Sequence, residues 1–415
     1  MTRLILSPLK VILRNTPEEW LEATGGDTIL LTGFDQDHSP EWLDENYGKS
    51  FQKIIAFRSY AANDLVLKTA DELFAEHTIE AVVPMAEIDV LRAALLRERH
   101  NLPGLLPQDA VYLRDKILMK EKASAAGVPV AKWKRVTNAL EVVDFAAEAG
   151  YPIVLKPIDG RGSAHTFVID SPAELDEHLE NGVLSATDRL PDLIVEEFIH
   201  GKQYRIDGFY ARGKCQFISA GRFIGTHLEF LAGGHLINAL LDAKSELAKE
   251  LVAFTRNILE NVLPLGEDGM FHVEVFRRPN GELVLGEAAA RLAGASVFEE
   301  NLASFGVNFK MAAVRSYCGF EPPSWPPGEQ LQQRLAGHVL ISPKPGVLVK
   351  APEALPFDWV YSFRCGPVGK RYEAMAYTNA EVATILVTGK DDREIEDRLI
   401  EAIAWFHDNT EWEQD

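Results

Sequence analysis

The chain of 415 residues is poor in cysteine, in positive charge and in long apolar runs. Its three cysteines, Cys215, Cys318 and Cys365, are far apart and odd in number, which excludes a disulfide framework and a zinc finger. Lys and Arg number 42 against 62 Asp and Glu, and the net charge of −20 argues against a general nucleic-acid binder. No apolar run approaches the roughly 18 residues of a membrane span, and the N-terminus lacks a signal-peptide core. We therefore expect a cytoplasmic globular protein that binds neither nucleic acid nor membranes.

Apolar residues supply 47% of the chain and charged residues 25%, which is enough for two to four packed domains. Short apolar runs alternate with helical patterns over the first 100 residues, and this alternation predicts a small open α/β domain with a parallel sheet. The motif GxGxxG is absent there, so a dinucleotide site is not indicated. The expected strands are 28–34, 53–57 and 81–84, and the expected helices are 63–77 and 88–99.

The rest of the chain mixes helices with antiparallel strands. Helices are expected at 114–126, 138–150 and 247–263, with strands between them. A proline-rich break at 320–328 precedes a small β-rich unit, which a helix from Arg393 closes.

Two glutamates flank a strong hairpin signal, Pro279–Asn280–Gly281. A two-residue turn at Asn280–Gly281 would place Glu274 directly opposite Glu287, where like charges destabilise the ladder. A divalent cation would reverse that repulsion, and hard oxygen ligands favour Mg²⁺. An exposed hairpin with solvated glutamates explains the same residues, and one extra residue in the turn would break the pairing.

A strand ending at Lys156 is followed by a loop that contains Gly160, Gly162 and Ser163. Backbone N–H groups of such loops can cradle phosphate oxygens, and a lysine at the strand end adds a charge. Lys116, at the start of its helix, could present a second cation. Neither a Walker A motif nor a complete GxGxxG is present, so an ordinary hairpin loop and a solvated lysine remain alternatives.

The apolar stretch 193–199 is interrupted by Glu196 and Glu197. Neighbouring residues of a strand face opposite ways, so one of these carboxylates points inward unless the strand lies at an edge. A buried carboxylate needs a partner, for which a lysine or an adenine amino group would serve.

Four stretches in this order resemble the ATP-grasp superfamily, and within it the carboxylate–amine ligases of the L-amino-acid ligase type. They are RDKILMK (114–120), YPIVLKPIDGRGS (151–163), LIVEEFIHGKQYRIDG (193–208) and FHVEVFRRPNGELVLGEAAARLAG (271–294). The resemblance implies an α/β (α+β) chain with the ATP-grasp fold. Its expected parts are an N-terminal open parallel α/β domain (1–110), two ATP-binding subdomains (111–195 and 196–325) and a small C-terminal β-rich subdomain (326–415).

The resemblance also implies roles for single residues. Arg291 would stabilise charge on the transferring phosphoryl group. Glu274 and Glu287 would hold one or two Mg²⁺ ions, with Mn²⁺ as an alternative. The residues expected to bind ATP are Lys116 and Lys156 at the phosphates, Gly160, Gly162 and Ser163 over them, Glu196, Glu197, Phe198 and Ile199 at the adenine, and Gln203 at the ribose.

Three positions depart from the family pattern. Gln203 stands where a ribose-binding glutamate is common, and Ala289 stands where a third metal ligand, asparagine, is usual. Ala293–Gly294 replaces the usual glycine pair after the arginine. The missing asparagine predicts a weaker hold on one of two metal ions rather than loss of activity, and Gln203 can still hydrogen-bond a hydroxyl without the charge.

The activity that the resemblance implies is ATP-dependent joining of a carboxylate to an amine, with small molecules such as amino acids as substrates. A homodimer is an open expectation, because relatives are often dimers. The alternatives are carboxylation of the kind that biotin carboxylase performs and a nucleotide-binding sensor without turnover. Candidate substrate contacts, each also explained by a structural role, are Glu87, Arg222, His227, Glu229, His235 and His272.

Overall fold

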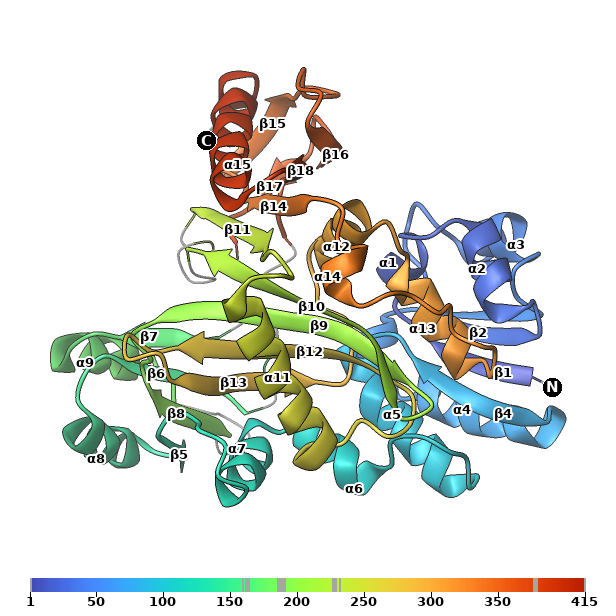
Figure 1. Cartoon of the computed structure of the whole chain (residues 1–415), viewed down its shortest axis with the longest axis horizontal. Coiled ribbons are helices and arrows are strands. Elements are labelled where there is room, and N and C mark those ends of the chain that lie inside the picture. The colour runs from blue at the N-terminus through green and yellow to red at the C-terminus, as the bar shows by residue number, and fades with distance from the viewer. Residues whose placement is uncertain are drawn as a thin grey trace.

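The computed structural model describes residues 2–158, 160, 165–184, 192–225, 230, 233–375 and 380–413. Within these residues the strands form four sheets (Figure 1). None of the helices in the described ranges is long and apolar enough to cross a membrane.

The N-terminal unit is a parallel sheet with helices on its faces, as the alternating pattern predicted. Its strand order is β3-β2-β1-β4, and β1, absent from the predicted strands, pairs with both β2 and β4. Every residue of β2 is buried, which is why the strand reads as a continuous apolar run. The elements are β1 (Thr2–Leu6), α1 (Leu9–Ile12), α2 (Pro17–Thr24), β2 (Thr28–Gly33), α3 (Pro40–Tyr47), β3 (Lys53–Phe57), α4 (Leu65–Glu76), β4 (Ile79–Pro84) and α5 (Glu87–Arg99).

A small antiparallel unit follows, with strand order β5-β8-β6-β7. Side-chain caps start its helices: Asp115 accepts from Ile117 and Leu118, Asn138 from Glu141, and Ser171 from Glu174. The elements are α6 (Pro107–Ala110), α7 (Lys116–Ala125), β5 (Trp133–Val136), α8 (Ala139–Ala149), β6 (Ile153–Pro157), β7 (Phe167–Ile169), α9 (Pro172–Glu180) and β8 (Leu193–Glu197).

The large sheet has eight strands in the order β13-β12-β9-β10-β11-β14-β18-β16. The last three belong to the expected C-terminal β-rich unit, so this unit continues the large sheet and adds only a small sheet, β17-β15-β19. The elements are β9 (Lys202–Ala211), β10 (Lys214–Ile224), β11 (His235–Leu240), α11 (Glu246–Asn261), β12 (Gly269–Arg277), β13 (Leu283–Ala289), α12 (Val297–Phe305), α13 (Phe309–Tyr317), α14 (Gly328–Leu331), β14 (Leu335–Ile341), β15 (Gly346–Lys350), β16 (Val360–Cys365), β17 (Arg371–Tyr372), β18 (Ala383–Gly389), α15 (Asp392–Asp408) and β19 (Glu411–Glu413).

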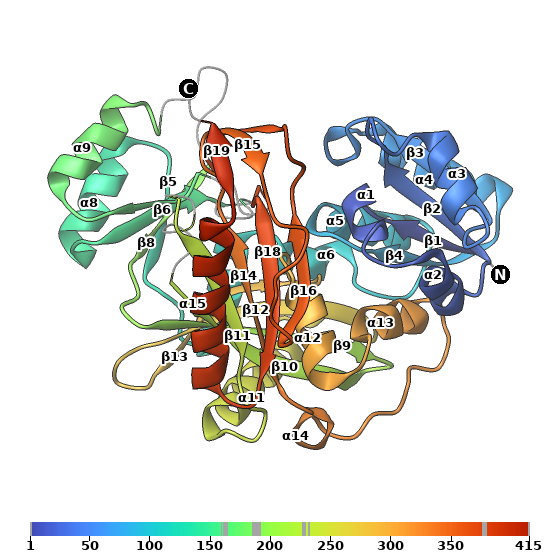
Figure 2. The same ribbon diagram turned by 90° about the horizontal axis from the view of Figure 1, so that it is seen from above.

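The two smaller sheet units lie at opposite ends of the long axis, with the large sheet between them (Figures 1 and 2). In Figure 2 the N-terminal unit is blue, the antiparallel unit of β5–β8 is green, and between them stand α15 in red and β14 and β18 in orange.

The β12–β13 hairpin confirms that Glu274 pairs with Glu287, but the predicted two-residue turn is wrong. Arg278 N donates to Glu282 O, which makes a three-residue loop and shifts the register by one. An extra residue on β13, between the pairs Glu274–Glu287 and Val275–Leu285, shifts the register back and so restores the pairing of Glu274 with Glu287. That residue is Gly286, where an added Cβ would lie only 2.8 Å from the Phe276 ring.

Candidate active site

A cavity of about 1700 Å³ lies where the three sheet units meet. Residues that follow all four parallel strands line it: Leu9 after β1, Phe34 after β2, Ser59 after β3 and Glu87 after β4. Ligands of open α/β sheets bind at this carboxyl edge of the strands. The opposite walls come from β6, β8 and the β9–β12–β13 face of the large sheet.

Glu274 and Glu287 lie opposite each other on the face of the large sheet that borders this cavity. Gln203 Nε2 donates to Glu274 Oε2 at 2.9 Å, and His272 Nε2 lies 3.3 Å from Glu274 Oε1. Two hard carboxylates held together in a cavity wall fit Mg²⁺. Among the described residues no cluster of three or more His, Cys, Asp or Glu could hold a metal, so an ion here would need further ligands from water or phosphate.

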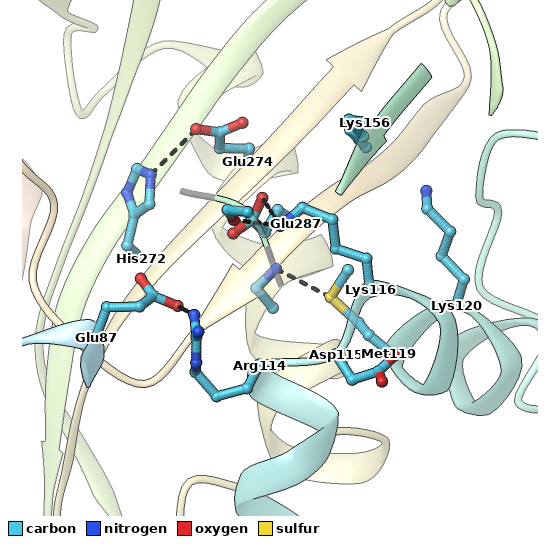
Figure 3. Close-up of polar contacts among 12 residues, drawn as sticks. Glu87, Arg114, Asp115, Lys116, Met119, Lys120, Lys156, His272, Glu274 and Glu287 are labelled. Atoms are coloured by element: carbon cyan, nitrogen blue, oxygen red, sulfur yellow. Dashed lines mark hydrogen bonds and ion pairs between the residues drawn. The ribbon is translucent and has the colours of Figure 1, made fainter. Parts of the chain in front are cut away.

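Three lysines face the carboxylates from the other side of the cavity. Lys116 and Lys120 are one turn apart on α7, and Lys156 lies in β6 (Figure 3). Lys116 Nζ donates to Gly160 O at 2.8 Å and lies 3.4 Å from Glu287 Oε2. This lysine therefore already contacts both the glycine loop and the carboxylate pair.

Glu196 is the inward-pointing carboxylate of β8, and it is 6% exposed. β8 lies between β5 and β6, so the edge-strand alternative is wrong and a lysine partner is confirmed. Glu196 Oε2 lies 3.1 Å from Lys156 Nζ and Oε1 lies 3.3 Å from Lys120 Nζ. Burial works against its charge, but the two lysines outweigh burial and lower the pKa of Glu196.

Glu197 faces the other way and ties β8 to its neighbours. Its Oε1 accepts from Lys132 N at 3.0 Å and from Arg278 Nη2 at 2.6 Å. Phe198, Ile199 and Gln203 follow and line the cavity. The connection from β8 to β9, which links the small antiparallel sheet to the large sheet, therefore presents backbone and side-chain groups to the cavity.

Arg291 and Arg114 both hydrogen-bond to Glu87, at the first turn of α5. Figure 3 shows Arg114 and Glu87 pointing toward each other below the carboxylate pair. Burial would raise the pKa of Glu87, but the two guanidinium groups outweigh burial and lower it from 4.5 to about 2. The buried carboxylate thus fixes the orientation of Arg291, and it also connects the N-terminal unit to the large sheet.

The lowered pKa of Glu87 predicts a pH-dependent contribution to stability. Because the folded pKa lies below the unfolded value, this contribution is complete above pH 4.5 and is lost as the pH falls toward 2. At pH 7, Glu87→Gln should lower the free energy of unfolding by about 3 kcal/mol. In urea denaturation the difference from wild type should shrink below pH 4.5. A constant difference across this range, or an equal effect of the exposed Glu98→Gln, would contradict the pairing.

His272 connects to three buried charged residues that the sequence analysis did not single out: Asp207, Arg205 and Glu300. Asp207 Oδ1 lies 2.8 Å from His272 Nδ1, and its Oδ2 lies 2.7 Å from Arg205 Nη1. Arg205 also hydrogen-bonds to Glu300 of α12. Asp207, Arg205 and Glu300 are fully buried. Burial works against the charge on His272, but Asp207 and Glu274 raise its pKa to about 9. Gln203, Arg205 and Asp207 alternate along β9, a spacing that could have indicated their common face.

Gly221 makes room for Arg205. An added Cβ would lie 2.8 Å from Arg205 Cζ and 3.2 Å from Ala239 O, and Arg205 cannot swing away without leaving its partners. We expect Gly221→Ala to destabilise the fold by about 1–3 kcal/mol in chemical denaturation. Gly328→Ala, where the nearest atom is 3.7 Å away, is the matched control and should change little. Equal effects of the two substitutions would contradict this explanation.

The structure does not bring every predicted residue to the carboxylate pair. Arg222 follows Gly221, which shares the face of Arg205 and Glu274, so alternation puts Arg222 on the other face. It lines the cavity from there and pairs with Glu396 at 2.6 Å. His235 is not among the described lining residues; its Nε2 lies 3.2 Å from Nε2 of His407. The predictions on Gly162, Ser163, His227 and Glu229 lie outside the described residues.

Sequence comparison identifies residues 149–299 as an ATP-grasp domain. The chain is 26% identical over 220 residues to the L-arginine-specific L-amino acid ligase of Bacillus subtilis, which covers 52% of each chain. It is 33% identical over 144 residues to the D-alanine–D-alanine ligase of Geobacter sulfurreducens, covering 34% of this chain and 43% of that protein. The chain thus spans about half of the length of the curated relatives it matches.

The whole fold also has solved counterparts. The crystal structure of an L-amino acid ligase from Bacillus licheniformis superposes with a TM-score of 0.74 at 17% identity, covering 100% of this chain and 98% of that one. A phosphoribosylglycinamide synthetase from Anaerococcus prevotii follows with a TM-score of 0.67 at 14% identity, covering 100% and 99%. The predicted resemblance is confirmed in these terms: residues 149–299 match an ATP-grasp domain, the whole chain has the fold of the solved L-amino acid ligase, and its sequence is similar to carboxylate–amine ligases of the L-amino-acid ligase type.

Proposed function

We propose that the chain is an ATP-dependent carboxylate–amine ligase that acts on small substrates, amino acids among them. The observation that carries the proposal is the convergence in one cavity of the Glu274–Glu287 pair, the three lysines and Arg291. The relatives named as amino-acid ligases support the same chemistry.

We assign each part of the reaction to described residues that line the cavity. Lys116 and Lys156 would hold the ATP phosphates, and the segment from Glu196 to Gln203 would hold the adenosine. Mg²⁺ held by Glu274 and Glu287 would neutralise phosphate charge together with these lysines. Gln203 and His272 orient Glu274 through the two contacts to its carboxylate.

In the first step a substrate carboxylate oxygen attacks the γ-phosphorus of ATP, and ADP leaves. Arg291, held by Glu87, stabilises the negative charge on the phosphoryl group as it moves to the carboxylate. In the second step an amine attacks the acyl carbon, and phosphate leaves as the amide forms. The amine loses a proton in that step. The acyl phosphate must be protected from water until the amine attacks it.

The test is phosphate release from Mg·ATP across a panel of amino acids, offered singly and in pairs, with hydroxylamine present to trap acyl phosphate. Release that requires a carboxylate and yields hydroxamate supports the ligase. Release that requires bicarbonate instead supports a carboxylase, and ATP binding without release supports the sensor. Glu287→Ala is the negative control, because turnover should disappear in an enzyme.

A further inference from the structure

Lys120 is a buried cation in the cavity wall that the roles proposed above do not use. Its side chain is 1% exposed, and no described residue hydrogen-bonds its Nζ. The contact that remains is the ion pair with Glu196 at 3.3 Å. A charge removed from water in this way costs several kcal/mol unless a counter-charge compensates it. Glu196 is therefore what keeps Lys120 in place.

Glu196 is shared between two lysines, one at each carboxylate oxygen. Lys156 lies 3.1 Å from Oε2, on the side of the glycine loop, and Lys120 lies 3.3 Å from Oε1, on the side of α7. Figure 3 shows Lys120 extending from α7 toward the strand that carries Lys156. Burial lowers the pKa of Lys120, and Glu196 opposes that shift. With both lysines protonated, the three groups carry one net positive charge, which suits an anion in the cavity.

The sharing matters when Lys156 turns toward phosphate. If Glu196 had Lys156 as its only counter-ion, a phosphate that drew Lys156 away would leave a buried carboxylate unpaired. With Lys120 present, Glu196 keeps a counter-ion at 3.3 Å in either state. Lys156 is then available to the nucleotide without that penalty.

We propose that Lys120 is a positioning residue that neutralises Glu196 and so releases Lys156 for the nucleotide phosphates. The proposal rests on the proposed function, because it takes Lys156 as a phosphate ligand. The competing possibility is that Lys120 contacts the nucleotide itself, and a double-mutant cycle separates the two.

The experiment measures ADP and adenosine binding by calorimetry for wild type, Lys120→Met, Glu196→Gln and the double variant. Lys120→Met should weaken ADP about tenfold, the size of one charge-assisted contact, and leave adenosine unchanged. In the Glu196→Gln background the same substitution should change ADP affinity less than about twofold, because no carboxylate remains to hold Lys156. Lys122→Met is the matched control: Lys122 is on α7 but pairs with Asp109 and the Tyr112 ring.

An equal loss of ADP affinity in both backgrounds would overturn the proposal in favour of direct contact, and no loss in either would reduce Lys120 to a structural role. If Lys120→Met does not fold, the double variant, which leaves neither charge buried alone, is compared with Glu196→Gln alone, and a difference in ADP affinity again overturns the proposal. Wild type that fails to bind ADP would contradict the proposed function instead, so the two failures are distinguishable.

Discussion

Replacing Arg291 with methionine should lower kcat about 10³-fold, the size of effect known for arginines that stabilise phosphoryl transfer. ADP affinity should stay within about twofold of wild type, because an interaction made only in the transition state affects turnover and not ground-state binding. The fold should tolerate the change, because Glu87 keeps Arg114 as its partner. Steady-state phosphate release and ADP calorimetry are the two measurements.

Arg277→Met is the control for this prediction. Arg277 is on β12, near the carboxylate pair in sequence, but it faces Glu250 of α11 instead of the cavity and should leave turnover unchanged. A fall in kcat of less than tenfold for Arg291→Met, or an equal loss of ADP affinity, would remove Arg291 from the chemistry.

Glu287→Gln should have opposite effects on turnover and on metal-free nucleotide binding. Loss of one of the two carboxylates proposed to bind the metal should reduce Mg²⁺-dependent turnover about 10³-fold, since a divalent ion supplies several kcal/mol of charge stabilisation. In EDTA, however, the same variant should bind ADP about threefold tighter than wild type, the worth of one partly exposed ion pair. The reason is the 3.4 Å contact between Lys116 Nζ and Glu287 Oε2, which competes with phosphate for the Lys116 ammonium group.

The control is Glu282→Gln, at the exposed end of the same hairpin, where Glu282 pairs with Arg278. It should change neither turnover nor metal-free ADP binding. Unchanged ADP affinity of Glu287→Gln in EDTA would show that Glu287 does not compete with phosphate for Lys116. Unchanged turnover in Mg²⁺ would remove Glu287 from the metal site.

The sequence predicted correctly that Glu274 pairs with Glu287, but it predicted the wrong loop length for the hairpin. The sequence indicates a hairpin around Pro279–Asn280–Gly281, and nothing in it distinguishes a two-residue from a three-residue loop. The extra loop residue and the extra residue at Gly286 shift the register in opposite senses and cancel. A bulge depends on how the ring of Phe276 packs against β13, which is tertiary information.

The alternation of β8 predicted an inward carboxylate, yet it could not select Glu196 over Glu197, because that choice depends on which sheet the strand joins. The sequence likewise could not show that Lys120 is buried next to Glu196. Its spacing of four residues from Lys116 puts the two on one helix face, but a solvated helix face has the same pattern. Arg222 and His235 were placed near substrate because they lie between β9 and β12 in sequence. The sheet register turns Arg222 away from the face that carries the carboxylate pair, although Arg222 still lines the cavity, and His235 contacts His407.

The unbroken order of the large sheet has a consequence for how the molecule can be divided. β11 is paired along five residues with β14, and β14 along seven with β18. A chain truncated near residue 330 would leave β11 as an edge strand with unpaired backbone N–H and C=O groups. The buried side chains of Leu236 and Leu240 would then be exposed to solvent. Such edges template aggregation. The C-terminal strands of the large sheet are therefore not an independent domain. They belong to the same hydrogen-bonded sheet as the strands of the carboxylate pair, so a truncated or redesigned protein must keep both.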